Sequence, residues 1–166
     1  MKLLDVKNLK KYFPLDTGLF AYLFTKEKRV VRAVDDISFF IRKGEVLGLA
    51  GESGCGKTTT GRLALRLLDP TSGQILYRGQ PLFESSPEEM RKMRKNMQII
   101  FQDPFASLNP RMRIGESIGH PLAIHSNQRT SEVRDHTLEI MEKVGMSPAS
   151  FLYDKYPHQL SGGQRQ

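Results

Sequence analysis

The sequence is short of cysteine and of long apolar runs, and each shortage excludes a class of protein. Cys55 is the one cysteine among 166 residues, so no internal disulfide can form, which fits a reducing compartment. No stretch approaches the roughly 18 to 20 uninterrupted apolar residues of a membrane-spanning helix. Residues 1–7 lack the apolar core and cleavage site of a secretory signal. We therefore expect the chain to stay in the cytosol unless a partner holds it at a membrane.

Acidic side chains are also in the minority. The 25 lysines and arginines outnumber the 18 aspartates and glutamates, which gives a formal net charge of +7. Such a charge permits nucleic acid or anionic lipid as a partner. The basic run at residues 91–95 has no interleaved aromatic side chains to stack on bases. We interpret it as a solvated helix face and expect no nucleic-acid partner.

What the sequence does contain is a complete phosphate-binding pattern. Residues 51–58 match GxxxxGK(S/T) at every fixed position. The apolar run 46–50 predicts a strand buried on both faces before this loop, and the apolar spacing of 57–68 predicts a helix after it. Glycines let backbone N–H groups converge on an anion, and a helix N-terminus adds unsatisfied N–H groups. A glycine-rich turn without a ligand is the alternative, and the full match in this context argues against it.

Individual side chains of this loop have distinct expected roles. Lys57 supplies a point charge for the β- and γ-phosphates, the Thr58 hydroxyl is placed to bind Mg²⁺, and Thr59 can donate to the α-phosphate. We interpret Cys55 as a small loop residue rather than a redox switch. The predicted ligand-binding residues of this loop are Gly51, Glu52, Ser53, Gly54, Cys55, Gly56, Lys57, Thr58 and Thr59.

Other segments predict strands in the first hundred residues and helices beyond them. The apolar patterns predict strands over 3–14, 30–41, 74–78 and 97–101, with a loop insertion at 15–29 that carries an apolar patch at 19–24. Helices are predicted over 87–94, 115–123 and 130–144. In the last of these, Thr130 or Ser131 can cap the start and Gly145 ends the helix. Its expected buried face consists of Val133, Ile140, Met141 and Val144.

A second glycine loop lies near the last residue. Residues 160–164 have the sequence Leu-Ser-Gly-Gly-Gln. Ser161 can cap a helix that begins there, and the two glycines leave backbone N–H groups open to an anion. Together with the loop at 51–58, this motif resembles the signature of the ATP-binding subunits of ABC transporters. Residues 101–112 and 156–159 resemble the oligopeptide/dipeptide importer branch of that family.

The resemblance implies an α/β fold. It would be a P-loop NTPase core of the ABC ATPase type, with an N-terminal antiparallel β subdomain and a helical subdomain, incomplete at the C-terminus. Residues 1–102 would form the β subdomain and the first part of the core. Residues 103–166 would form the helical subdomain that ends in the signature. ATP and Mg²⁺ are the implied cofactors.

The resemblance also assigns roles by position. Phe13 lies where the family has an aromatic that stacks on adenine, and Tyr12 is the neighbouring candidate; burial of both in the core is the alternative. Gln102 matches a glutamine that coordinates Mg²⁺ or the attacking water. Lys57 and Gln102 are thus the expected catalytic residues, and Thr58 and Gln102 the expected metal ligands. In the family the signature loop closes over the γ-phosphate held by a second subunit, which implies ligand contacts for Ser161, Gly162, Gly163 and Gln164.

The implied function is that of an ATP-hydrolysing, energy-coupling subunit of an importer for oligopeptides or dipeptides, peripheral on the cytoplasmic face of the cell membrane. Its implied partners are a second ATPase subunit, identical or related, transmembrane permease subunits and, indirectly, a solute-binding protein. The alternative is a soluble ABC-type ATPase that acts on nucleic acid or ribosomes. The coiled-coil, zinc or tandem-domain insertions usual in such proteins are missing from this sequence.

The sequence departs from the family pattern after the signature. ABC ATPases continue into a strand that ends in Asp-Glu and later into one that ends in histidine; these side chains support Mg²⁺, polarise the attacking water and contact the γ-phosphate. None of the 166 residues supplies them, and His158 precedes the signature. We therefore expect this chain to bind nucleotide with negligible hydrolysis, and its apolar sheet edges to make it poorly stable alone.

Overall fold

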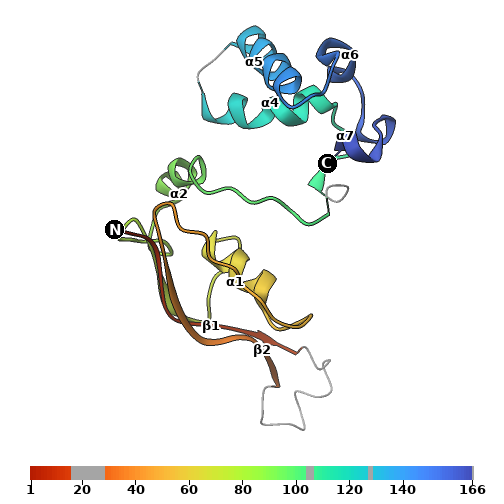
Figure 1. The fold of residues 1–166 in the computed structure, drawn as a ribbon. Coiled ribbons are helices and arrows are strands. Elements are labelled where there is room, and N and C mark those ends of the chain that lie inside the picture. The colour runs from red at the N-terminus through yellow and green to blue at the C-terminus, as the bar shows by residue number, and fades with distance from the viewer. Residues whose placement is uncertain (16–28, 104–106, 127–128, 166) are drawn as a thin grey trace, which may run out of the picture. The chain divides into compact units, whose positions relative to one another are not determined.

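The computed structural model describes residues 1–15, 29–103, 107–126 and 129–165. The chain forms two compact units, Met1–Gln98 and Ile99–Gln166. The first holds the sheet, and the second holds a group of helices (Figure 1). The apolar patch expected at 19–24 lies outside the described residues. The functional division after Gln102 stays a prediction.

The first unit is built on an antiparallel sheet with the strand order β2-β1-β3-β4. Its strands are β1 (Lys2–Pro14), β2 (Val30–Arg42), β3 (Ser72–Tyr77) and β4 (Gln80–Pro81). β1 lies inside the sheet, because Leu4 pairs with Ile41 of β2 on one side and with Tyr77 of β3 on the other. The strands predicted over 3–14, 30–41 and 74–78 are confirmed.

The core of this unit forms between the sheet and two helices. In α1 (Lys57–Ala64), Leu63 is fully buried in one cluster with Leu9 of β1 and Ile75 of β3. In α2 (Pro87–Arg94), Met90 joins the same cluster. The buried side chains of β1 mark the face that these helices cover, and an irregularity between Val6 and Leu9 keeps Leu9 in the same cluster.

The α2 helix has the predicted bounds, and its start shows why. The Oγ of Ser86 accepts a hydrogen bond from the N–H of Glu89 at 3.3 Å, and Oε2 of Glu89 accepts one from the N–H of Ser86 at 2.7 Å. This reciprocal cap satisfies two backbone donors that the helix leaves free. The backbone hydrogen bond from Ser86 is also the main cause that lowers the pKa of the Glu89 carboxyl.

Two predicted strands are wrong. Residues 46–50 and 97–101 form no strand, and most of their apolar side chains are exposed: Val46 is 95% exposed and Ile100 is 98% exposed. An apolar run becomes a buried strand only when neighbouring strands satisfy its N–H and C=O groups. Within the described residues, the antiparallel sheet has β2 and β4 as its edges and pairs with neither run.

The first helix is shorter than predicted. It ends at Ala64 instead of residue 68. The chain turns at Arg66, whose φ is 50°. The Arg66 guanidinium donates to the carbonyl oxygens of Leu82 at 2.9 Å and Ser85 at 2.8 Å. These contacts with the segment before α2 hold the turn, and the apolar spacing of 63–68 does not reveal them.

The second unit contains short helices around its own core. They are α4 (Ile114–His125), α5 (Thr130–Lys143), α6 (Ala149–Tyr153), the 3₁₀ turn η2 (Pro157–Gln159) and α7 (Gly162–Arg165). The buried cluster consists of Ile114, Met141, Ala149, Leu152 and Leu160. The helices predicted over 115–123 and 130–144 are confirmed. No helix in the described part of the chain has the length and apolarity needed to cross a bilayer.

The predicted buried face of α5 is partly wrong. Met141 is buried, but Ile140 is 38% exposed and Val144 is 67% exposed. Thr137 is buried instead, because its hydroxyl donates to the Val133 carbonyl at 2.7 Å and so needs no other partner. The predicted caps at 130 and 131 are also wrong: Glu132 accepts from the N–H of Arg129 at 3.1 Å. Gly145, at φ 81°, ends the helix as predicted.

Candidate functional site

The glycine loop before α1 takes a backbone path that other residues adopt with strain. Gly54 has a φ of 85° and Gly56 a φ of 95°. At Gly56 a side chain is excluded as well, because a Cβ there would lie 2.1 Å from the carbonyl oxygen of Ala33 in β2. A bare backbone at this position lets the start of α1 approach the sheet closely.

The start of α1 presents unsatisfied N–H groups beside this loop. The first intrahelical bond runs from the N–H of Thr60 to the carbonyl oxygen of Gly56 at 2.8 Å. The N–H groups of Lys57, Thr58 and Thr59 therefore have no acceptor within the helix. The first turn holds no acidic residue, and the cap residue Gly56 has no side chain to occupy these donors. Such a helix end attracts an anion.

Lys57 reaches back over the same loop. Its Nζ donates to the carbonyl oxygens of Gly51 at 2.8 Å and Glu52 at 2.6 Å. The ammonium is therefore held against the loop that leads into α1, to which it adds a full positive charge. Thr58 is exposed and Thr59 is half-buried, so both hydroxyls stay reachable for a ligand. Phosphate oxygens fit this donor set of an ammonium, hydroxyls and backbone N–H groups.

The structure separates the two aromatic candidates on β1. The Lys11 ammonium lies 5.0 Å from the centroid of the Phe13 ring, so these two side chains lie on one side of the strand. Tyr12 lies on the other side, because Tyr12 and Phe13 pair with β2 in regular register. Neither ring belongs to the buried core, and Phe13 is 37% exposed. The alternative that both are core aromatics is therefore wrong.

Tyr12 has a partner of its own on that opposite face. Its hydroxyl donates to the carboxylate of Asp35. This hydrogen bond raises the pKa of the Tyr12 phenol and lowers the pKa of the Asp35 carboxyl, because it favours the protonated phenol and the charged carboxylate. The Arg32 guanidinium lies 5.6 Å from the centroid of the Tyr12 ring. The contacts of Tyr12 are thus with side chains of β2.

The signature residues belong to the second unit, as does the exposed Gln102. Ser161 caps α7 as predicted: its Oγ accepts from the N–H of Gln164 at 3.3 Å, and Oε1 of Gln164 accepts from the N–H of Ser161 at 3.0 Å. The role of Gln164 in this cap was missed, although serine and glutamine three residues apart are a known capping signal. Gly162 and Gly163 face open space, so a Cβ at either would meet nothing within 4 Å.

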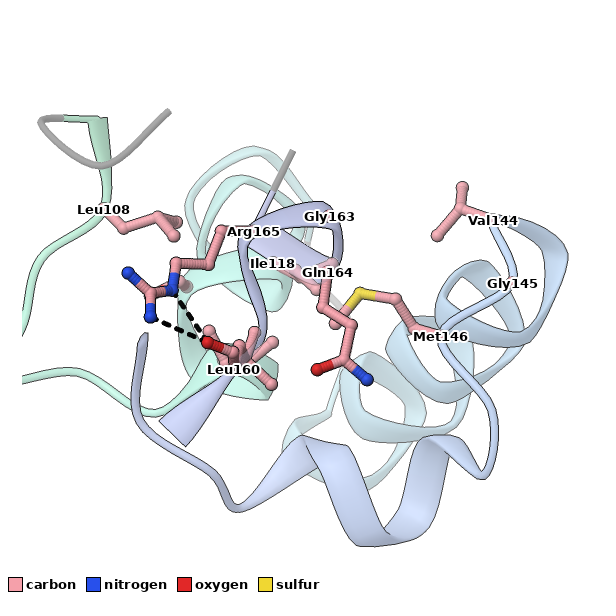
Figure 2. A pocket seen from close by; sticks show the side chains of 11 residues that line it. Leu108, Ile118, Val144, Gly145, Met146, Leu160, Gly163, Gln164 and Arg165 are labelled. Carbon is pink, nitrogen blue, oxygen red and sulfur yellow. Dashed lines mark hydrogen bonds between the residues drawn. The ribbon is translucent and has the colours of Figure 1, made fainter. Parts of the chain in front are cut away.

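Arg165 is a second residue that the sequence did not single out. Its Nε and one terminal nitrogen both donate to the Leu160 carbonyl, at 3.0 and 2.7 Å, which closes the loop onto its own start (Figure 2). Beside it lies a cavity of about 430 Å³. The cavity has mainly apolar walls and is lined by Leu108, Ile114, Ser117, Ile118, Val144, Gly145, Met146, Leu160, Gly163, Gln164 and Arg165.

Taken with the sheet beside it, the loop at 51–59 defines the class of domain: a P-loop nucleotide-binding domain, in which a helix N-terminus and a lysine form a cradle for phosphate. A family model described as ABC transporter matches residues 34–166. The chain belongs to the ABC transporter family.

Similar proteins carry related names. The oligopeptide transport ATP-binding protein AppF of Bacillus subtilis (strain 168) is 46% identical over 165 residues, which are 99% of this chain and 48% of AppF. The dipeptide transport ATP-binding protein DppF of Haemophilus influenzae is 46% identical over 164 residues, 99% of this chain and 48% of DppF. The chain thus spans about half the length of these curated relatives.

Solved structures show the same fold. A dimeric structure of a post-hydrolysis state of the ATP-binding cassette MJ0796, bound to ADP and Pi, has a TM-score of 0.74. The match is 23% identical in sequence and covers 98% of this chain and 65% of that chain. The likeness shows that the chain has the ABC ATPase type of α/β fold, with the antiparallel sheet as its N-terminal part.

Proposed function

We propose that this chain is the nucleotide-binding part of an ATPase subunit that drives import of oligopeptides or dipeptides. The observation that carries the proposal is the cradle at 51–59, which combines the Lys57 ammonium, three N–H groups without an acceptor in the helix and the hydroxyls of Thr58 and Thr59. The names of AppF and DppF support the peptide substrate class. ATP and Mg²⁺ are the ligands that this cradle suits.

The proposal assigns parts to predicted site residues of the first unit. Lys57 leaves its loop carbonyls to bind the β- and γ-phosphates, and Thr59 donates to the α-phosphate. Thr58 would hold Mg²⁺, which when bound would neutralise charge on the phosphates. The metal-binding and water-orienting roles of Gln102, which belongs to the second unit, stay predictions. Phe13 stacks on the adenine ring.

The signature loop acts on a different nucleotide. Gly162 and Gly163 are not required by the fold of this chain, because a Cβ at either would meet open space. Glycine there instead admits a close approach from outside, which supports contact with ATP held by a second ATPase subunit. Permease subunits hold the pair peripherally at the cytoplasmic face of the membrane, and a solute-binding protein delivers the cargo. A soluble ATPase that acts on nucleic acid or ribosomes is not favoured, because the named relatives are transport proteins.

Binding is tested by calorimetric titration of the 166-residue chain with ATP and Mg²⁺. Loss of a charged hydrogen-bond donor costs about 1.5–3 kcal/mol of binding free energy, so Lys57→Ala should weaken the affinity for ATP by roughly 10-fold or more. Lys92→Ala is the matched control, because Lys92 belongs to α2 and forms a surface ion pair with Glu88 of the same helix. Equal affinity of the wild type and Lys57→Ala would refute the cradle.

Hydrolysis is tested separately on the same proteins. The proposal expects this chain to bind nucleotide with negligible steady-state turnover, because the Asp-Glu pair and the histidine that the family uses in hydrolysis are not among its residues. ATP turnover by the wild type that Lys57→Ala abolishes would refute the expected lack of hydrolysis. It would not contradict the proposed nucleotide-binding site.

A further inference from the structure

Lys11 occupies an unexpected place beside the aromatic candidate on β1. Its Nζ lies 5.0 Å from the centroid of the Phe13 ring, within the range of a cation–π contact. The same Nζ donates to the carbonyl oxygen of Asp69 at 2.7 Å. The Lys11 ammonium therefore lies over the Phe13 ring, and its hydrogen bond to the Asp69 carbonyl fixes its position.

The segment that holds Lys11 is itself tied to β1. The N–H of Thr71 donates to the Lys10 carbonyl at 2.8 Å, and the N–H of Tyr12 donates to Oγ1 of Thr71 at 2.9 Å. These bonds place Asp69 alongside the strand, shortly after α1 ends. The ammonium of Lys11 is thus a fixed point on the sheet surface and not the end of a free side chain.

We propose that Lys11 is a positioning residue for the base of the bound nucleotide. Lys11 covers one face of the Phe13 ring and so presents the other face to an adenine. An exposed phenylalanine otherwise loses rotational freedom when a ligand orders it, and a ring that is already held avoids part of this cost. The inference rests on the proposed function, in which Phe13 stacks on the adenine of the ATP whose phosphates bind at 51–59.

Lys10 provides a matched control on the adjacent position. Its charge acts on Asp35, the partner of Tyr12, where it is among the causes that lower the pKa of that carboxyl. Lys10→Met and Lys11→Met remove the same charge from the same strand. Only Lys11→Met removes the contact with Phe13. A general effect of net charge on ligand affinity therefore appears equally in the two variants.

The experiment compares two ligands on the full 166-residue chain. ATP has a base and inorganic tripolyphosphate has none, and both are titrated calorimetrically with Mg²⁺. Lys11→Met should weaken ATP binding about two- to five-fold, the range of an exposed cation–π contact, and leave tripolyphosphate binding unchanged. Lys11→Arg should restore most of the ATP affinity, and Lys10→Met should change neither ligand. Unchanged tripolyphosphate binding also shows that the variants are folded.

The Phe13→Ala background completes the test. If Lys11 acts through the ring, Lys11→Met has no further effect on ATP once Phe13 is absent. An equal loss for tripolyphosphate, or a loss that persists without Phe13, overturns the proposal. If Phe13→Ala leaves ATP affinity unchanged, the stacking of Phe13 on adenine and the positioning role of Lys11 are both refuted, whereas the phosphate cradle is not. If the wild type binds neither ligand, the proposed function fails and takes this inference with it.

Discussion

Gly56→Ala should damage the phosphate loop more than the same substitution at Gly54. Both residues have positive φ, 95° and 85°, so alanine at either is strained by about 1–2 kcal/mol. At Gly54 a Cβ would meet nothing within 4 Å, whereas at Gly56 it would lie 2.1 Å from the Ala33 carbonyl oxygen. Forcing an atom into packed backbone costs about 1–3 kcal/mol more. We expect losses of about 1–2 kcal/mol for Gly54→Ala and about 2–5 kcal/mol for Gly56→Ala.

Gly61→Ala is the control for the substitution itself. Gly61 lies inside α1, and a Cβ there would also meet nothing within 4 Å. Alanine is the better helix former by about 1 kcal/mol, so this variant should gain stability. Urea unfolding followed by far-UV circular dichroism gives the free energies, and tripolyphosphate titration shows whether the cradle survives. A Gly56→Ala variant as stable as Gly54→Ala would refute the close approach of α1 to β2.

Two further changes test single contacts. Tyr12→Phe removes the hydrogen bond that is the main cause of the lowered Asp35 pKa, so that pKa should rise toward its ordinary value in a carboxyl-carbon NMR titration. Because the folded-state pKa of Asp35 is depressed, the stabilisation from this hydrogen bond is present above about pH 4 and is lost as pH falls through the folded-state pKa. The free energies of unfolding of the wild type and Tyr12→Phe should therefore differ at pH 6 and converge in acid. An Asp35 titration that does not shift in Tyr12→Phe would contradict this prediction. Ser117→Ala should raise the free energy of unfolding by about 1 kcal/mol, because the buried Ser117 hydroxyl has no hydrogen-bond partner among the described residues. A lower urea midpoint for the variant would show that the hydroxyl has a partner.

Elements with local causes were predicted well. The bounds of α2 follow from Pro87 and from the cap that Ser86 and Glu89 form within one turn. The end of α5 follows from a glycine with positive φ. The runs at 46–50 and 97–101 failed because a strand depends on a partner elsewhere. Their apolar pattern shows what such a segment would bury, but not whether another strand pairs with it.

The site was predictable to a similar depth. The loop residues follow from a contiguous pattern, and in the structure Lys57 reaches back to the carbonyls of Gly51 and Glu52. The different partners of Tyr12 and Phe13 did not follow, because the contact of Tyr12 with β2 depends on a strand register that shifts between Lys11 and Tyr12. Lys11 was missed because its partner Asp69 lies 58 residues away. A cation and an aromatic two positions apart on one strand are the signal that could have pointed to it.

The two glycine loops owe their glycines to different causes. In the first loop, positive φ and the approach of Ala33 require Gly56 within this chain, so the cradle is a property of its own fold. In the second loop, a Cβ at Gly162 or Gly163 meets open space, and the cap of Ser161 with Gln164 already holds the helix start. Packing within the described residues therefore does not account for glycine at these two positions. The proposed contact with ATP held by a second subunit would account for it, because a backbone without side chains admits a close approach.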